Sequence, residues 1–144
     1  MRTVIDILQN VLKGTSISGY YYNHGGFEIE FDKNSKIYSL ELNEFYLESK
    51  EHWEVLIKKC GIGTEPEDTI RALILTELLW EKGSEVLTVQ YSNEENCIYI
   101  IFKNQKRLII NLSIDENFDE FALSLKEQNR VILDIKNNKQ FIYA

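Results

Sequence analysis

The sequence predicts an α+β fold, with an antiparallel or mixed sheet built from hairpins and helices packed on it. Three observations predict it: segments that alternate between apolar and polar residues, polar turns that join such segments, and apolar residues at helical spacing. The expected element order is α-βββ-αα-βββ-α-ββ. The chain has 144 residues, the usual length of one domain with its own core, so we expect residues 1–144 to form a single domain.

The first half of the chain is expected to begin with a helix and three strands. Apolar residues in the first twelve positions have helical spacing, and Gly14 is a typical helix end. A strand is expected over residues 16–23, followed by a turn at His24, Gly25 and Gly26. Residues 27–32 alternate between apolar and acidic side chains, and residues 37–42 alternate again.

These two alternating strands also predict how they pair. A polar turn over residues 33–36 would set apolar residues opposite apolar residues on one face. The expected pairs are Phe31 with Tyr38, Ile29 with Leu40, and Phe27 with Leu42. This face is therefore expected to point into the core.

Two helices are expected in the middle of the chain. Ser49 can begin a helix that runs to residue 60, with Gly61 after its end. Residues 64–67 form a capping box, with Pro66 in the first turn of a helix that ends near Lys82. Apolar residues lie nearly all round this second helix, so we expect it to be the central buried helix.

The second half is expected to contain strands over residues 86–91, 97–102 and 108–112. The last two are apolar on both faces, which is typical of strands covered on two sides. A capping box at residues 113–116 predicts a helix with one apolar face, formed by Phe118, Phe121, Ala122 and Leu125. Residues 131–136 and 140–143 are expected to form a closing hairpin around Asn137 and Asn138.

The net charge of −7, from 23 acidic and 16 basic residues, restricts the partners. Such a chain is repelled by a nucleic-acid backbone and by an anionic membrane surface, so we expect neither as a partner. No apolar run approaches the roughly 20 residues that span a bilayer, and the N-terminal segment has the pattern of a helix and not of a signal peptide. We therefore expect a cytoplasmic protein whose charged partners are cationic.

The alternation of residues 27–32 places Glu28, Glu30 and Asp32 in a row on the face opposite the core, roughly 7 Å apart. Glu41 would lie across from Glu28, and Glu44 and Glu48 follow in the sequence. Like charges facing each other across two strands are destabilising. Three interpretations are open: a solvated strand face, a surface for a cationic partner, or a metal site, for which EF-hand spacing is absent.

Tyr21 is a further candidate for the same surface. In a strand it faces away from Tyr20 and Tyr22, so at least one of the three tyrosines is expected on the exposed side, near the acidic strand in sequence. The three tyrosines are either good β-formers or include an aromatic contact within an acidic rim. The predicted partner-binding residues are Glu28, Glu30, Asp32, Glu41, Glu44, Glu48 and Tyr21.

No residue pattern indicates catalysis, a cofactor or a metal. The phosphate-binding, zinc-protease and nucleophile-elbow motifs are absent. Cys60 and Cys97 have no CxxC spacing, and we expect both thiols to be buried rather than paired with His24 or His52 as nucleophiles. We therefore expect no catalytic residue, no cofactor and no metal ligand.

These observations favour a non-catalytic protein-binding domain. The charge pattern fits an immunity or antitoxin protein that neutralises a basic toxin domain, such as a nuclease, because an acidic blocker associates faster with a basic site. Three alternatives are open: a small-molecule-binding or regulatory domain with an internal pocket, a structural or adaptor subunit that forms a homodimer through a free strand edge, and an unfamiliar enzyme.

Overall fold

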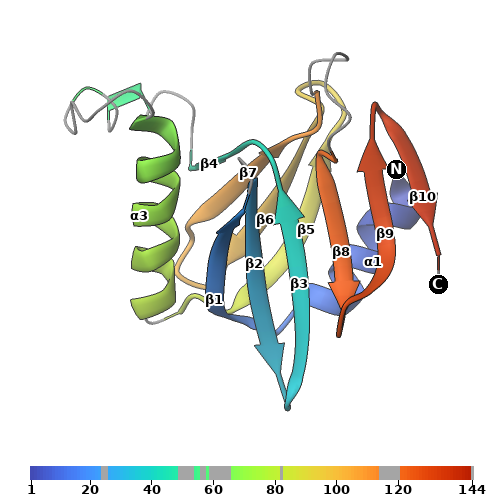
Figure 1. The fold of residues 1–144 in the computed structure, drawn as a ribbon, viewed down its shortest axis with the longest axis horizontal. Helices are drawn as coiled ribbons and strands as arrows, with labels where there is room; N and C mark the ends of the chain where they lie inside the picture. The colour runs from blue at the N-terminus through green and yellow to red at the C-terminus, as the bar shows by residue number, and fades with distance from the viewer. Residues whose placement is uncertain are drawn as a thin grey trace.

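Two antiparallel sheets form the body of the protein in a computed structural model, which describes residues 1–23, 26–48, 54–55, 58, 66–81, 83–113 and 121–143. Within these residues, the larger sheet has six strands in the order β1-β2-β3-β8-β9-β10, and the smaller has four in the order β4-β7-β6-β5. Helix α1 contacts β5, and helix α3 contacts β1 and β4 (Figure 1). The predicted α+β class with a mostly antiparallel sheet is confirmed.

The elements follow the alternation and turn signals of the sequence. The helices with full bounds are α1 (Arg2–Leu12) and α3 (Pro66–Trp80). The larger sheet comprises β1 (Ser16–Asn23), β2 (Gly26–Lys33), β3 (Lys36–Leu42), β8 (Leu123–Glu127), β9 (Arg130–Lys136) and β10 (Lys139–Ile142). The smaller sheet comprises β4 (Phe45–Leu47), β5 (Val86–Ser92), β6 (Cys97–Phe102) and β7 (Arg107–Asn111).

The β2–β3 hairpin has the predicted register. Phe27 pairs with Leu42, Ile29 with Leu40, and Phe31 with Tyr38. The two turn residues, Asn34 and Ser35, have φ of 52° and 68°, the positive values that a tight hairpin turn matching the strand twist requires. The closing hairpin β9–β10 uses the same device at Asn137 and Asn138, with φ of 51° and 61°.

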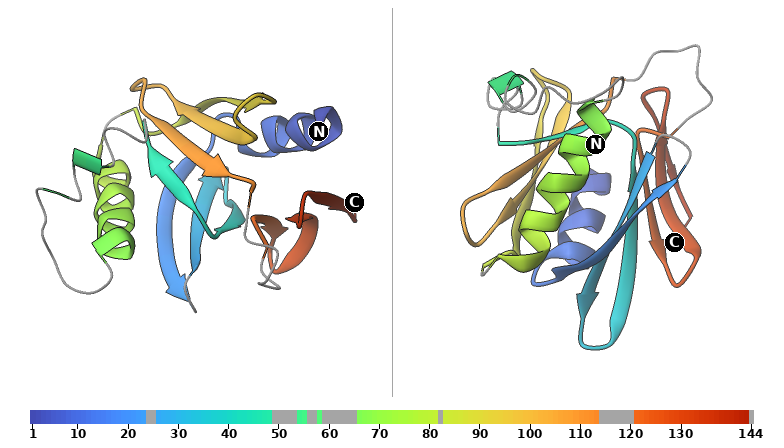
Figure 2. Two further views of the ribbon diagram at one scale, coloured as in Figure 1. Left: turned by 90° about the horizontal axis from the view of Figure 1, so that it is seen from above. Right: turned by 60° about the vertical axis from the view of Figure 1, so that its left-hand side comes forward.

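The hydrophobic core lies between the inner faces of the two sheets (Figure 2). Phe27 of β2 meets Phe45 of β4 edge-on, with ring centroids 5.5 Å apart, so the two sheets touch directly. Helix α1 adds one stripe of buried residues, Val4, Leu8 and Leu12, spaced four residues apart. Neither described helix packs on the outer face of the larger sheet, although Ser124 and Asp134 on that face are buried.

The prediction that α3 is buried all round is wrong. Ile74, Leu75 and Leu78 are buried, whereas Leu73 is 48% exposed and Trp80 is 83% exposed. The helix lies along one side of the sheets, where it contacts β1 and β4 through a single face. A helix in this position buries one stripe, whatever the composition of its other side.

The predicted helix that would carry Leu125 is wrong at its C-terminal end. Leu123–Glu127 forms β8, which lies between β3 and β9, and both Leu123 and Leu125 are fully buried. Ser124 points to the opposite face, so the short apolar stretch has the period of a strand. Phe118 lies outside the described residues, and Phe121 and Ala122 directly precede the strand.

Strands β6 and β7 are covered less completely than predicted. Ile98, Ile100 and Phe102 are fully buried, but Cys97, Tyr99 and Ile101 on the other face are only half-buried. The short strand β4 was not expected. The turn at His24 and Gly25, most of the predicted helix over residues 49–60, and the helix start at residues 114–116 lie outside the described residues.

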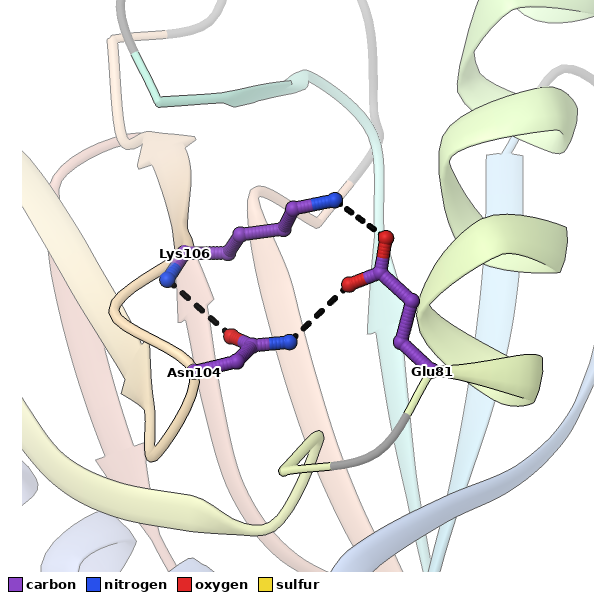
Figure 3. Close-up of polar contacts among 3 residues, drawn as sticks. All are labelled: Glu81, Asn104 and Lys106. Atoms are coloured by element: carbon purple, nitrogen blue, oxygen red, sulfur yellow. Dashed lines mark hydrogen bonds and ion pairs between the residues drawn. The ribbon is translucent and has the colours of Figure 1, made fainter.

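A polar cluster fixes the end of α3 to the turn between β6 and β7 (Figure 3). Glu81 accepts a hydrogen bond from Asn104 Nδ2 at 3.0 Å and forms an ion pair with Lys106. Asn104 Oδ1 in turn accepts from the backbone N–H of Lys106 at 3.1 Å. Gly83, between α3 and β5, has φ of 79°, and an added Cβ there would come within 3.2 Å of Asn104. Among the described helices, none is long and apolar enough to cross a membrane.

Candidate functional site

The outer face of the larger sheet carries most of the predicted partner-binding residues. One row crosses all six strands, with Glu28 paired to Tyr21 on one side and to Glu41 on the other. The row continues through Ser124, Asp134 and Phe141. The structure therefore brings Tyr21, Glu28 and Glu41 side by side, and the predicted opposition of Glu28 and Glu41 is confirmed.

The next positions along β2 extend the acidic character of this face. Glu30 lies between Gly19 of β1 and Ser39 of β3, and Asp32 lies opposite Ile37. Because Gly19 has no side chain, the Glu30 carboxylate can lie over β1, with Oε2 3.5 Å from where a Cβ would be. We call Tyr21, Glu28, Glu30, Asp32 and Glu41 together the acidic surface.

The charges of the acidic surface are largely left uncompensated. Among the described residues, no lysine or arginine forms an ion pair with Glu28, Glu30 or Asp32. Glu41 is the exception, because Lys126 Nζ of β8 lies 3.2 Å from its Oε2. That pair is partly exposed to solvent and contributes at most about 1 kcal/mol to stability.

Tyr21 belongs to the acidic surface both by position and by bonding. Tyr21 is 56% exposed. Hydrogen bonding to Glu30 raises the pKa of Tyr21, and the negative charges of Glu30 and Glu28 add to the effect. Tyr20, paired with Ile29, lies on the other side of β1 and bonds Thr76 of α3 at 2.7 Å. The predicted opposite orientation of Tyr21 and Tyr20 is confirmed.

Glu44 and Glu48 lie apart from the acidic surface, at the two ends of β4 in the smaller sheet. The Glu44 carboxylate accepts a hydrogen bond from Asn111 Nδ2 at 2.8 Å. The backbone N–H of Glu48 donates to the carbonyl of Arg107 at 2.7 Å, and its φ of 63° turns the chain after β4. Both residues help to attach β4 to β7.

Asp134 is an acidic residue of this face that the sequence analysis did not single out. It is only 5% exposed, and its Oδ1 accepts a hydrogen bond from Ser124 Oγ at 2.5 Å. Burial raises the pKa of Tyr143, and the charge of Asp134 and hydrogen bonding to it add to the effect. A signal was available, because Asp134 interrupts an otherwise apolar strand. Its partners all come from the protein itself, so Asp134 is a structural group.

The described residues show no arrangement typical of a reactive thiol or a metal centre. The Cys97 thiol is half-buried and donates to the carbonyl of Glu95 at 3.3 Å. Burial raises the pKa of Cys97, and the Glu95 carboxylate raises it further, so the thiol stays protonated at neutral pH. In the described ranges, no three His, Cys, Asp or Glu side chains gather to hold a metal ion. His24, His52 and Cys60 lie outside them.

A pocket of about 290 Å³ lies between the start of α1 and the turns of the two sheets. Its polar groups bond one another: Tyr91 donates to Asn96 Oδ1 at 3.2 Å, and Asn96 Nδ2 donates to Asn138 Oδ1 at 3.4 Å. The volume is at the lower limit of the roughly 300–1,000 Å³ that ligand pockets occupy. The residues that line it are Met1, Tyr91, Asn96, Leu112, Ile135, Asn138 and Gln140.

The acidic surface is thus the feature with the clearest binding chemistry. It presents carboxylates that repel each other and an exposed tyrosine ring, all held on paired strands of a rigid sheet. A lysine or arginine placed among them would relieve this repulsion and gain charge-assisted hydrogen bonds. No protein-family model, curated protein or solved structure matches the chain.

Proposed function

We propose that this chain is a non-catalytic protein-binding domain that covers a basic partner with its acidic surface, in the manner of an immunity or antitoxin protein. One observation carries the proposal. Glu28, Glu30 and Asp32 share the outer face of the larger sheet and form no ion pair with the lysines and arginines of the described residues.

The physical argument is that, without a partner, repulsion between the carboxylates of the acidic surface destabilises the folded protein. Glu28, Glu30 and Asp32 stand in a row along one face of β2, and Glu28 also faces Glu41, whose charge Lys126 partly offsets. A cationic partner would remove that repulsion on binding, and the local negative potential would speed its approach. A toxin that acts on nucleic acid needs a basic substrate site, and this site is what an acidic inhibitor would cover.

Tyr21 supplies the second component of such an interface. Tyrosine is enriched among the residues that dominate binding energy, because it buries a large rigid ring and keeps a polar end. Here Tyr21 is 56% exposed and is paired with Glu28 on the neighbouring strand. A bound arginine could contact the ring and the carboxylates together.

The first test compares two variants with the same change of net charge. Glu30→Lys with Asp32→Lys alters the acidic surface, whereas Asp6→Lys with Glu94→Lys alters exposed positions on α1 and on the β5–β6 turn. An immunity protein is expected to be encoded beside its toxin, so the partner to use is the basic domain of such a neighbour, and the measurement is its association rate constant at several salt concentrations. The surface variant should associate at least about tenfold more slowly at low salt, because steering is lost.

The control variant separates a local effect from a general one. Asp6→Lys with Glu94→Lys should keep most of the wild-type rate constant, because both positions lie away from the acidic surface. Equal slowing of both variants would indicate that only the net charge matters. Unchanged binding of the surface variant would show that the acidic surface is not the interface.

A second candidate function rests on the pocket beside α1. Its volume of about 290 Å³ and its mixture of apolar and amide groups would suit a small polar ligand. A ligand bound there would raise the melting temperature by mass action, and Asn96→Leu should abolish that rise. The pocket has weaker support than the acidic surface, because its polar groups already bond one another.

A further inference from the structure

We propose that β10 is a self-association edge, through which two copies of this chain pair as antiparallel strands about a twofold axis at Phe141. This proposal is independent of the acidic surface, which lies on strands β1–β3, toward the opposite edge of the same sheet. The edge strands of the two sheets are β1, β10, β4 and β5. An edge strand offers unpaired N–H and C=O groups to another strand unless the protein covers or distorts it.

The edges of the smaller sheet are covered by groups from the protein itself. On β5, the backbone N–H of Val89 donates to Gln9 Oε1 of α1 at 2.5 Å, and the N–H of Val86 donates to the carbonyl of Thr15 at 2.8 Å. On β4, the carbonyl of Phe45 accepts from Arg71 Nε of α3 at 3.0 Å. Neither edge is open to a second strand along its length.

The edge strand β1 is irregular, and helix α3 lies beside it. A bulge between Ile17 and Gly19 breaks its register with β2, and α3 contacts the strand from the side. The Tyr20 hydroxyl bonds Thr76 of α3 at 2.7 Å and fixes this contact. Bulges and covering helices are two of the devices by which proteins keep edge strands from pairing.

Strand β10 has neither device. Its pairing with β9 is regular, it contains no proline, and all four of its residues are exposed. Phe141, Ile142 and the following Tyr143 are 40%, 42% and 60% exposed. Within the described residues, the backbone hydrogen bonds of β10 run only to β9. The strand thus combines apolar side chains with an open edge, the features that favour strand addition.

The register with β9 determines which backbone groups point outward. Lys139 and Lys136 close the two-residue turn, and the N–H of Tyr143 donates to the carbonyl of Ile132. Bonded and non-bonded pairs alternate along antiparallel strands, so residues 139, 141 and 143 bond β9. The N–H and C=O groups of Gln140 and Ile142 therefore point away from the sheet.

This arrangement is self-complementary. With the axis at Phe141, Gln140 lies opposite Ile142 of the second copy, and each outward N–H meets an outward C=O. Phe141 contacts Phe141 of the second copy on the outer face. Lys139 lies opposite Tyr143 of the second copy, where an ammonium group can contact the ring. The same four-residue strand thus satisfies both sides of the interface.

Charge also favours β10 over the other edge of the larger sheet. Strands are about 4.8 Å apart, so pairing at β10 would hold the two copies of β2 about 43 Å apart, whereas pairing at β1 would bring them within about 14 Å. The screening length at physiological salt is about 8 Å. Repulsion between two copies of the acidic surface is therefore negligible at β10. The residues nearest this edge include Lys136 and Lys139, and not the carboxylates of β2.

The interface is small, so we expect a dimer that depends on protein concentration. Sedimentation equilibrium from about 10 µM to about 1 mM covers the range in which small interfaces associate. The wild-type chain should change from monomer to dimer within this range. Ile142→Pro removes an outward N–H that makes no bond to β9, so it should prevent dimerisation while the monomer folds.

A pair of matched variants tests the side chains. Phe141→Lys would set two like charges together at the axis, and it should keep the chain monomeric at every concentration. Ile37→Lys also replaces an apolar residue with lysine on the same face of the sheet, at a position of β3 that is 44% exposed. This variant should dimerise as the wild type does. Circular dichroism and the melting temperature establish that each variant is folded.

Two results would overturn the proposal. One is a wild-type chain that stays monomeric up to about 1 mM, the upper end of the range for such interfaces. The other is a Phe141→Lys variant that is folded and still dimerises, which would place the interface elsewhere. Glu30→Lys with Asp32→Lys should leave dimerisation unchanged, so failure of this proposal and failure of the proposed function are separate outcomes.

Discussion

Asp134 places a carboxylate where water hardly reaches it, on the outer face of the larger sheet. A buried charge is tolerated only when hydrogen bonds replace its hydration. Ser124 of the neighbouring strand β8 provides such a bond, at 2.5 Å. Asp134 thereby ties β9 to β8.

We predict that Ser124→Ala lowers the free energy of unfolding by about 1–3 kcal/mol, because Asp134 loses a short hydrogen bond in a buried position. Urea denaturation followed by circular dichroism measures the change. Ser39→Ala is the matched control, since Ser39 lies half-buried on the same face of β3. Equal stability of the two variants would mean that the bond contributes nothing measurable.

At the scale of single residues, the sequence could predict the acidic surface because it depends on local alternation. The turn at Asn34 and Ser35 fixes which carboxylates of β2 face those of β3. Lys126 could not be predicted as the neighbour of Glu41, because that pair depends on β3 lying beside β8, strands far apart in the sequence. Glu44 and Glu48 follow the acidic strands closely in sequence, yet the chain has already moved to the other sheet.

Among the elements, α1 has a role beyond its apolar stripe. The side-chain oxygen of Gln9 accepts hydrogen bonds from the backbone N–H of Val89 and from the Thr88 hydroxyl, at 2.5 Å and 3.1 Å. The helix thus occupies part of the β5 edge. An edge strand covered in this way is less open to pairing with another chain.

We predict that Gln9→Ala lowers the free energy of unfolding by about 1–3 kcal/mol, because the N–H of Val89 loses its acceptor in a partly buried place. The loss should appear in urea denaturation and as faster hydrogen exchange at Val89. Asn10→Ala, an exposed amide on the same helix, should leave both measurements close to wild type. Exchange at Val89 that does not change in Gln9→Ala would contradict this role.

The elements differ in how far sequence alone determines them. The two hairpins with short polar turns were predictable, since turn chemistry and alternation agree. Residues 122–125 fit either a helical or a strand pattern, and pairing of Leu125 with Leu40 and Leu133 decides for the strand. Strand β4 has three residues, too few for an alternating pattern to be recognised. The outer side of α3 also carries apolar residues, so the sequence did not indicate that Trp80 would be exposed.

For the whole molecule, tyrosine titration predicts a loss of stability in alkali. Hydrogen bonds or burial raise the pKa values of Tyr21, Tyr99 and Tyr143 above the usual value of about 10. Above pH 10 the folded protein therefore keeps protons that the unfolded chain releases. The free energy of unfolding must fall as pH rises through this window, and the contribution of these groups is complete below it.

The measurement is urea denaturation at about pH 8 and about pH 11, below and above the usual tyrosine pKa. We expect the wild type to lose more stability between these pH values than a variant with Tyr21, Tyr99 and Tyr143 changed to Phe. Phenylalanine keeps the ring and has no proton to lose. The same decline in both proteins would assign the alkaline sensitivity to other groups.

The strand order of the larger sheet has a consequence for how the chain can fold. Strand β3 joins β8 along a seam where Leu40 meets Leu125 and Leu42 meets Leu123, and the entire smaller sheet is encoded between them. During synthesis, strands β1–β3 leave the ribosome before β8 has been made. Strand β3 therefore cannot pair with β8 until the later part of the chain has followed. Pairings so distant along the chain close slowly, because the intervening segment first loses its freedom.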